Sequence, residues 1–403
     1  MRVLLSTWGS RGDVEPLLAL ALELCGRGVD VRMCAPPDFA ERAAEVDVPF
    51  VPMGFAVREV VTSKPSPAEV AAGLVAQHFD VIGKAARDCD AVVATGLMPA
   101  GVRSVAEHLG IHYVLAGFHP VGIPSLHHPP GRRPGKPFPP GETDLRVLWR
   151  IDAERVDAMY REPLNTQRAT LGLPPVDNVR DHVFTAQPWL AVDPVLWPLE
   201  ETLGFDPVQT GAWIMPDDRP LPTDVVEFLD AGDPPVYVGF GSMPMASAPD
   251  VAAVAVEAIR AQGRRVLISR GWADLAPADG KDDCLAVGEA NHRALFRRVA
   301  AVVHHGGAGT TTAAALAGAP QVIVPQLVDQ PYWARRVAAL GIGAELDGPT
   351  PTGESLSAAL DVALRADTAA RAAEVGATVR TDGAAVAASR LVDLVDAVPS
   401  AAD

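Results

Sequence analysis

The stretch AVVHHGGAGTTTAA, residues 301–314, decides the fold of this chain. An apolar run with the composition of a strand leads into two histidines and a glycine-rich turn, which opens into an alanine-rich run typical of a helix. Glycine at positions 306, 307 and 309 lets the backbone approach a ligand closely, and the first amides of a helix point outward without partners. This order predicts a strand–turn–helix unit that holds an anion such as a diphosphate.

Side chains in the same stretch favour the diphosphate. His305 can donate a hydrogen bond to a phosphate oxygen, and Thr310 or Thr311 can add a hydroxyl. The turn matches neither G-x-x-x-x-G-K-[ST] nor a clean G-x-G-x-x-G, so the two commonest phosphate-loop motifs are disfavoured. The alternative is a strand-to-helix turn that needs glycine only for its backbone.

Short runs rich in Val, Ile and Leu alternate with helical patterns, such as Pro16–Arg27 and Met98–Leu109, along the whole chain. Such alternation indicates β-α-β units and parallel sheets with both faces covered. The predicted strands form two series, the first Arg2–Ser6, Val31–Cys34, Ala91–Ala94, Tyr113–Ala116 and Trp189–Ala191, the second Val236–Gly239, Arg265–Ser269, Leu285–Val287, Ala301–His304 and Gln321–Val324. The sequence therefore predicts an α/β protein with two doubly wound domains and a cleft between them.

Two segments interrupt these series. Prolines and an acidic pair in VQTGAWIMPDDRPLP, residues 208–222, suit a linker between domains over 1–207 and 223–380. The segment 119–143 is rich in Pro and Gly, carries Arg132, Arg133 and Lys136, and cannot be a regular element. Two interpretations are open, a disordered loop and a mobile wall of a substrate pocket, and both can hold at once.

Composition excludes several classes of partner. The chain has 403 residues, 48% of them hydrophobic, which is enough for two or three domains. A net charge of −16 disfavours nucleic acid and anionic membrane surfaces as partners. Without a charge-free apolar run of about 18 residues or a secretory leader pattern, we expect no membrane span and a cytoplasmic location. The four cysteines show no metal-binding spacing.

The first predicted strand ends in TWGSRGDVEP, residues 7–16, a second glycine turn that opens a helix. With Pro16 at the first helical position, Asp13 lies just upstream and is free to point into the cleft. Ligands of doubly wound sheets bind at such carboxyl ends of strands. The alternative role for Asp13 is a helix N-cap.

Two further turns follow predicted strands of the second series. GFGSMP, residues 239–244, places Gly241 and Ser242 where they could complete the phosphate site. QLVDQPYWA, residues 326–334, places Asp329 and Gln330 beside the phosphate turn. A carboxylate accepts two hydrogen bonds and an amide both donates and accepts, so the pair suits sugar hydroxyls. The alternative for this pair is again a helix cap.

Six motifs together resemble the nucleotide-sugar glycosyltransferases of natural-product biosynthesis, and in particular those that glycosylate vancomycin-group glycopeptide aglycones. They are GSRGDVEP at 9–16, TGAW at 210–213, GFGS at 239–242, SRGWADL at 269–275, HHGGAGTT at 304–311 and PQLVDQPYWA at 325–334. They occur in the family's order with similar spacing and cover almost the whole chain.

The resemblance implies a GT-B fold: two Rossmann-like domains facing a central cleft, with a C-terminal helix, 381–403, returning to the first domain. Domain 1–207 would bind the acceptor and domain 223–380 the donor. The family is inverting and needs no metal and no cofactor, and a dTDP-sugar or UDP-sugar is the co-substrate. The D-x-D sequence at 88–90 precedes a predicted strand, which disfavours a metal–diphosphate role for it.

Site residues follow from the same resemblance. Asp13 would be the catalytic base, and His119 and Pro120 would contact the acceptor. The donor would be bound by Ser10, Arg11, Gly12, Gly241, Ser242, Trp272, His305, Gly306, Gly307, Ala308, Gly309, Thr310, Asp329 and Gln330. Trp272 and the backbone near 289–291 would face the nucleotide base.

The chain departs from the family pattern at two positions. Many relatives have a catalytic histidine in the first turn, but the first histidine here is His78. A glutamate that grips the ribose often stands eight residues after the phosphate-site histidine, where this chain has Ala313. The second departure leaves a deoxyribose, hence a dTDP-sugar, open, while Asp329 and Gln330 favour a hydroxyl-rich hexose such as glucose.

The primary interpretation is an inverting O-glycosyltransferase that transfers a hexose or deoxyhexose to a hydroxyl of a bulky aglycone, an aromatic glycopeptide heptapeptide. A polyketide or macrolide aglycone is an alternative acceptor. Rival classes are a Rossmann dehydrogenase, a non-hydrolysing sugar-nucleotide epimerase and a non-catalytic nucleotide-binding partner of a transferase. We expect the chain to act as a monomer or a weak dimer.

Overall fold

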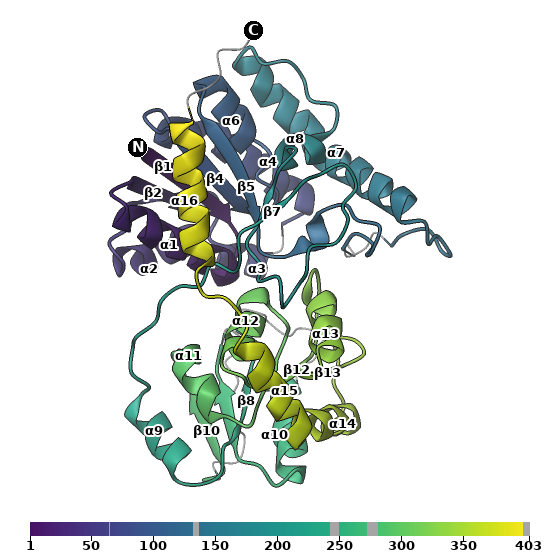
Figure 1. Ribbon diagram of the computed structural model, residues 1–403. Helices are drawn as coiled ribbons and strands as arrows, with labels where there is room; N and C mark the ends of the chain where they lie inside the picture. Colours follow the sequence, from purple (N-terminus) through teal and green to yellow (C-terminus); the bar gives the residue numbers. More distant parts are fainter. Residues whose placement is uncertain (64, 132–136, 242–249, 272–280, 398–403) are drawn as a thin grey trace.

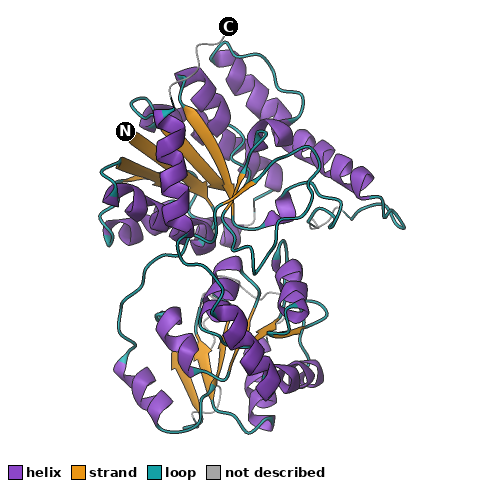
Figure 2. Cartoon of the chain, viewed as in Figure 1, coloured by secondary structure: helices purple, strands orange, loops and turns teal. Residues whose placement is uncertain are grey.

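The computed structural model describes residues 1–63, 65–131, 137–241, 250–271 and 281–397, except for the side chains of Val61 and Thr62. In this part of the chain two helix-covered sheets lie one above the other, and the N-terminal unit is the upper one in Figure 1. Figure 2 shows the strands at the centre of each unit with helices around them. The predicted α/β class is confirmed.

Strands of the first sheet are all parallel and follow the order β3-β2-β1-β4-β5-β6-β7. They are β1 (Arg2–Trp8), β2 (Asp30–Ala35), β3 (Phe50–Pro52), β4 (Ala91–Gly96), β5 (His112–Gly117), β6 (Trp189–Leu190) and β7 (Val208–Gln209). The chain runs from β1 to one edge and then crosses back to β4. The direction of winding therefore reverses next to β1, and ligands of such sheets bind outside the carboxyl ends at that reversal.

The second sheet repeats this plan with the order β10-β9-β8-β11-β12-β13, again all parallel. Its strands are β8 (Val236–Gly239), β9 (Val266–Ser269), β10 (Cys284–Val287), β11 (Ala301–His304), β12 (Gln321–Ile323) and β13 (Gly343–Glu345). Here the winding reverses between β8 and β11. The glycine turn predicted to bind diphosphate follows β11, so it lies at the reversal.

Helices join the strands and cover both sheets. In the first unit they are α1 (Arg11–Gly26), α2 (Ala40–Ala44), α3 (Val57–Ser63), α4 (Pro67–Gln77), α5 (Gly83–Ala85), α6 (Val102–Leu109), α7 (Leu145–Thr170) and α8 (Val179–Phe184). In the second they are α9 (Thr223–Asp230), α10 (Val251–Ala261), α11 (His292–Leu295), α12 (Ala308–Leu316), α13 (Gln330–Ala339), α14 (Gly353–Ala363) and α15 (Ala366–Gly376), and the last described helix is α16 (Gly383–Asp396).

All ten predicted strands are present, with ends within two residues of the prediction. Their continuous apolar composition reflects burial on both faces of a parallel sheet. The sequence prediction missed β3, β7 and β13, which have only two or three residues each and are too short to show a pattern. β7 lies at the start of the predicted linker and pairs with β6.

Two predicted helix starts are wrong. α1 begins at Arg11, so Pro16 lies inside the helix and Asp13 belongs to its first turn. Ser10 and Asp13 form a capping box that starts the helix early, and the fixed φ of proline still suits a helix at Pro16. α6 begins at Val102 rather than at residue 98, and Gly101 precedes it as the N-cap.

The C-terminal helix returns to the first unit, as the GT-B expectation requires. In Figure 1 α16, drawn in yellow, lies beside α1. Its Ala384, Ala387, Ala388 and Leu391 are part of the core built on the first sheet. Small side chains let the helix approach α1 closely. The fold prediction, including this returning helix, is confirmed.

A buried apolar cluster connects the two units on the side of α13. Leu190 ends β6, and Val192 and Leu196 follow it, yet they pack with Trp333 and Val337 of α13. Arg336 of α13 also donates to the carbonyl oxygens of Leu196 at 2.7 Å and Val195 at 2.9 Å. The helix that follows the predicted sugar-binding pair is thus fixed to the first unit by both apolar and polar contacts.

Candidate active site

Turns at the carboxyl ends of both sheets bring the predicted site residues together. The turn after β1 carries Asp13, the turn after β11 carries His305, and the turn after β12 carries Asp329. Asp329 acts electrostatically on both Asp13 and His305. Three residues from widely separated parts of the sequence therefore meet between the two units.

Asp13 is held by the start of its own helix. The backbone N–H of Ser10 donates to Asp13 Oδ2 at 2.9 Å, which is the reciprocal bond of a capping box. A Cβ at Gly9 would collide with this carboxylate, so glycine is needed for the turn to fold back over it. The sequence offered two roles for Asp13, a residue free in the cleft and an N-cap, and the observed position is the third residue of α1.

Burial raises the pKa of Asp13 to about 7. The hydrogen bond from Ser10 opposes this shift, and the negative charge of Asp329 adds to it. The side chain remains half-buried rather than fully enclosed. A carboxylate that is crowded by protein, partly exposed and titrating near neutral pH has the properties of a general base.

The glycine turn after β11 has the geometry that an anion site needs. Gly306 has φ +90°, and a Cβ there would lie 2.7 Å from Ile323 Cγ2. A Cβ at Gly307 would lie 2.7 Å from His305 Nε2, so only glycine lets the imidazole lie over the turn. The amides of Ala308, Gly309 and Thr310 have no intrahelical partner because they begin α12. They point out of the helix with the positive end of its dipole behind them.

Two groups of this turn are already engaged inside it. The Gly306 N–H donates to Nδ1 of the buried His304 at 3.1 Å, so Gly306 contributes its backbone conformation rather than a free amide. The Thr311 hydroxyl donates to the carbonyl oxygen of Gly307 at 2.9 Å. Of the two threonines considered for a phosphate, the half-buried Thr310 is the better placed.

His305 is a neutral imidazole at physiological pH. Burial lowers its pKa to about 4, against the opposing effect of Asp329. Its Nδ1 is buried and has no hydrogen-bond partner within the described residues. A neutral ring can still donate one hydrogen bond to a phosphate oxygen, but it adds no positive charge.

Asp329 and Gln330 lie at the start of α13, and they differ in which side-chain atoms are already hydrogen-bonded within the protein. Asp329 occupies the N-cap position without capping the helix, and its Oδ2 accepts from Trp333 Nε1 at 2.8 Å. Gln330 is buried, and its Oε1 accepts from the N–H groups of Gln326 and Leu327 at 2.8 and 3.1 Å. The Gln330 carbonyl therefore shapes the turn, which leaves its amide nitrogen as the group that could meet a sugar.

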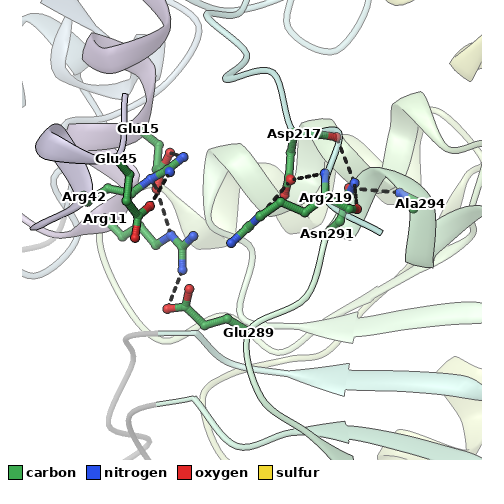
Figure 3. Close-up of polar contacts among 9 residues, drawn as sticks. All are labelled: Arg11, Glu15, Arg42, Glu45, Asp217, Arg219, Glu289, Asn291 and Ala294. Carbon is green, nitrogen blue, oxygen red and sulfur yellow. Dashed lines mark hydrogen bonds and ion pairs between the residues drawn. The ribbon is translucent and has the colours of Figure 1, made fainter. Parts of the chain in front are cut away.

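An ion pair that sequence reasoning missed crosses between the units near this site. Figure 3 shows Arg11, from the first turn of α1, reaching Glu289 of the segment after β10. The Nη1–Oε1 distance is 2.8 Å. On the same side, Asn291 Nδ2 donates to the carbonyl oxygens of Asp217 and Arg219 in the predicted linker. Nothing in the sequence relates Arg11 to Glu289, since only the fold brings them together.

The predicted acceptor residues lie at the carboxyl end of β5. His119 precedes a 3-10 turn, Pro120–Gly122, and its Nδ1 is buried without a partner in the described part of the chain. Pro120 is buried and shapes the turn. Of the predicted irregular segment 119–143, the described parts 119–131 and 137–143 contain no regular element apart from this turn and a bridge between Ser125 and Thr202.

Other predicted residues are placed as follows. Gly241 has φ +56° and lies close to His305, because a Cβ there would be 3.7 Å from His305 Cε1. Ser242 and Trp272 lie outside the described residues, as do Arg132, Arg133 and Lys136. Ser10 is the N-cap of α1, and Gly12 lies in the first turn of that helix.

The D-x-D sequence lies at the amino ends of β1 and β4, opposite the candidate site, where Asp88 and Asp90 accept hydrogen bonds from the side chain and the N–H of Arg2. Among the described residues no three His, Cys, Asp or Glu side chains gather as metal ligands would. The described helices include none with the length and apolar character that crossing a bilayer demands.

Two family models match the chain. The glycosyltransferase family 28 N-terminal domain matches residues 3–117. The C-terminal domain of erythromycin biosynthesis protein CIII-like proteins matches residues 285–392. The first match covers the turn with Asp13, and the second covers the phosphate turn and the Asp329–Gln330 pair.

Named relatives match over almost their whole length. Glycosyltransferase GtfE of Amycolatopsis orientalis is 56% identical, and 97% of each chain is covered. The vancomycin aglycone glucosyltransferase of the same organism is 54% identical over 98% of each chain. Its dTDP-epi-vancosaminyltransferase is 49% identical over 93% of each chain.

Solved structures share the architecture at low identity. The kitacinnamycin glycosyltransferase superposes with a TM-score of 0.74 at 20% identity, covering 98% of both chains. The glycosyltransferase VinC, solved with dTDP, gives a TM-score of 0.68 at 19% identity and covers 98% of this chain and 99% of VinC. These two likenesses support the fold alone.

Proposed function

This chain belongs to the family of natural-product glycosyltransferases that includes the vancomycin-group enzymes, and from that premise we propose that it transfers a hexose or deoxyhexose from a dTDP-sugar or UDP-sugar to a hydroxyl of a glycopeptide aglycone. We propose further that the reaction inverts the anomeric centre in a single displacement. Asp13 is the proposed base, and the turn after β11 is the proposed diphosphate site.

The observation that carries the proposal is the meeting of Asp13 and Asp329 between the two sheets. A displacement needs a base beside the acceptor hydroxyl and a sugar held so that its anomeric carbon faces that hydroxyl, with the diphosphate on the opposite side. Asp13 comes from the first unit and Asp329 from the second, and each lies within electrostatic reach of the other. A sugar bound at Asp329 would therefore have its anomeric carbon near the base.

In the proposed step, the acceptor hydroxyl gives its proton to Asp13 while its oxygen forms a bond to the anomeric carbon. The bond from that carbon to the diphosphate oxygen breaks, and its electron pair leaves with the nucleoside diphosphate. The amides that begin α12 and the neutral His305 hydrogen-bond the departing charge. In this arrangement, groups of the protein itself stabilise the leaving diphosphate.

Two features support a bulky, largely apolar acceptor. Large apolar side chains are exposed just after strand ends of both sheets: Phe55 after β3, Leu97 after β4, and Leu327 and Val328 after β12. Where such groups gather into one patch, they mark a binding surface. The vancomycin aglycone glucosyltransferase, whose name states a glycopeptide acceptor, also matches 98% of this chain at 54% identity.

A macrolide acceptor is the second candidate, since one matching family model is named for erythromycin biosynthesis. That model covers residues 285–392, which lie in the proposed donor half. It therefore bears on the donor more than on the acceptor.

The test offers the purified protein a vancomycin-group heptapeptide aglycone or a macrolide aglycone, each with dTDP-glucose, UDP-glucose or a dTDP-deoxyhexose. We expect a hexose or deoxyhexose mass increment on the heptapeptide, undiminished by chelator. An increment on the macrolide alone would replace the acceptor assignment. Tight dTDP binding without transfer to any acceptor would favour a non-catalytic nucleotide-binding partner.

A further inference from the structure

One hydrogen bond joins the acceptor side of the structure to the helix that follows the predicted sugar-binding pair. The hydroxyl of Tyr332, in α13, donates to the carbonyl oxygen of Pro129 at 2.9 Å. Pro129 belongs to residues 125–129, which follow β5 in the first unit and are called the acceptor-side segment below. The bond therefore crosses from the second unit to the first, one helical turn from Asp329.

The acceptor-side segment has a defined conformation on its other face. Trp149 Nε1, from α7, donates to the carbonyl oxygens of Ser125 at 2.9 Å and His128 at 3.1 Å. The Ser125 hydroxyl accepts from the His127 N–H at 3.0 Å and donates to the carbonyl oxygen of Glu201 at 3.1 Å. These bonds hold the segment on the first unit, so the Pro129 carbonyl that accepts from Tyr332 has a defined position.

Aromatic rings continue this contact in both directions. The His128 ring packs edge-on against Trp149 at 5.8 Å and against Tyr332 at 5.7 Å between centroids. On the other side of Tyr332, the ring of Trp197 lies 6.2 Å away and also packs against Trp333 at 5.1 Å. Trp333 donates to the Asp329 carboxylate. A contiguous set of side chains therefore runs from the acceptor-side segment to Asp329.

We propose that Tyr332 is a positioning residue, which holds the acceptor-side segment in register with Asp329 so that the acceptor hydroxyl meets the anomeric carbon of the bound sugar. This inference rests on the proposed function, because it assigns the first unit to the acceptor and Asp329 to the sugar. The physical reason is that the two substrates lie on different units, and displacement requires the reacting atoms within about 3–3.5 Å. A bond between the units beside the site limits their relative displacement there.

The Tyr332 hydroxyl is not what joins the units. Arg336 makes two bonds to the 195–196 backbone, and the apolar cluster of Trp333 and Val337 buries the same interface. Loss of one hydroxyl leaves these contacts in place. Its removal is therefore expected to disturb the register of the acceptor-side segment without detaching α13.

Tyr332→Phe tests the proposal, because it removes the hydroxyl and keeps the ring. Tyr113→Phe is the matched control, since the Tyr113 hydroxyl also donates to a main-chain carbonyl, that of Val183 at 3.0 Å, within the first unit. We expect Tyr332→Phe to lower kcat/KM for the acceptor roughly fivefold to tenfold, the effect of one hydrogen bond. Its dTDP dissociation constant in calorimetry should stay within about twofold of wild type. Tyr113→Phe should leave both quantities unchanged.

Hydrogen exchange supplies a readout that needs no acceptor. Peptides covering residues 125–131 should exchange faster in Tyr332→Phe than in wild type or Tyr113→Phe. The exchange measurement can be read even if no aglycone is glycosylated. A failure of the proposed function is therefore distinguishable from a failure of this inference. Equal exchange in the two variants, or equal acceptor kinetics, would overturn the positioning role.

A double-mutant cycle separates positioning from general loosening. His128→Ala removes the ring that lies between Trp149 and Tyr332. If both side chains hold the same segment, the loss in acceptor kcat/KM for the double variant is smaller than the product of the single losses. Independent, multiplying losses would contradict the proposal.

Discussion

At the scale of single residues, Asp13 and Glu69 occupy the same position in two capping boxes, but their pKa values are shifted in opposite directions. Glu69 accepts from the Ser66 N–H at 2.9 Å on the exposed start of α4, and hydrogen bonds from Ser66 lower its pKa. Asp13 accepts from the Ser10 N–H at the same distance, yet burial raises its pKa to about 7. The local motif is shared, so the difference arises from what the tertiary structure places around each carboxylate.

Asp13→Asn is expected to lower the transfer rate by roughly 10²–10⁴, because asparagine accepts the Ser10 bond but cannot take up a proton. Glu69→Gln is the matched control and should leave transfer unchanged. Steady-state kinetics with the heptapeptide aglycone measures both. Near-normal turnover in Asp13→Asn would reduce Asp13 to a helix cap.

The thermal stability of Asp13→Asn should not fall along with its transfer rate. The folded-state pKa of Asp13 lies above the ordinary value, so the wild type loses stability as pH rises from about 4 through 7 and the buried carboxyl ionises. Asp13→Asn carries no such charge. We therefore expect its melting temperature at pH 8 to equal or exceed that of wild type, and a clearly lower value would contradict this reading of the site.

The pH dependence of transfer should report the pKa of Asp13. We expect kcat/KM to rise with pH up to about 7 and then level off, because the base must be ionised. Asp329→Asn removes a neighbouring negative charge, so the rising limb should shift toward lower pH by up to about one unit. Glu289→Gln is the control, since that carboxylate pairs with Arg11. An unshifted limb in Asp329→Asn would remove the link between the two aspartates.

At the scale of elements, α12 illustrates how a turn reserves space for a ligand. Gly307 is needed by the protein itself, because a Cβ there would strike the His305 ring. Gly309 is different: a Cβ at this position would meet no atom within 4 Å, and its φ is not in the left-handed region. The fold alone gives no reason for glycine at 309, whereas a diphosphate lying over the first turn of α12 would.

Gly309→Ala is therefore expected to preserve or raise stability, by up to about 1 kcal/mol, since alanine is the better helix former. The same variant should weaken dTDP binding roughly tenfold or more, because the methyl group occupies the space of the phosphate. Gly353→Ala, in the first turn of α14 with equally open surroundings, is the control. Unchanged dTDP affinity in Gly309→Ala would place the diphosphate elsewhere.

At the scale of the whole molecule, the two units are connected unequally on their two sides. Along α13 they share a buried apolar cluster and the main-chain bonds of Arg336. On the side of Arg11 and Glu289 the described residues include an ion pair between exposed groups, which salt screens and which contributes little. We therefore expect relative movement of the units to pivot on α13 and to open on the side of Arg11.

Exchange of units tests the proposed division of labour. Replacing residues 1–207 together with 381–403 by those of a relative should transfer acceptor preference and leave donor preference behind. A chimera that exchanges 1–207 alone should melt at a lower temperature, because α16 packs in the core of the first sheet. Retention of the original aglycone preference in both chimeras would place acceptor recognition in the second unit.

The sequence by itself determined most of the fold, because local patterns carry that information. Apolar runs and glycine turns located ten strands within two residues, and the stretch 301–314 predicted the strand–turn–helix unit that the structure shows at β11 and α12. The short strands β3, β7 and β13 and the start of α1 escaped prediction, since two or three residues show no period and Pro16 suggested a later start. The roles assigned to the site residues stay predictions.

Only the tertiary structure decided how those residues behave. The pKa of Asp13 depends on burial and on Asp329. His304 occupies the Gly306 amide, and the backbone of Gln326 occupies the side-chain carbonyl of Gln330, so neither group is available to a ligand. Contacts between the units, Arg11 with Glu289 and Tyr332 with Pro129, join residues that no sequence pattern relates. Desolvation and contact are properties of distance in space, and a single sequence specifies distance only along the chain.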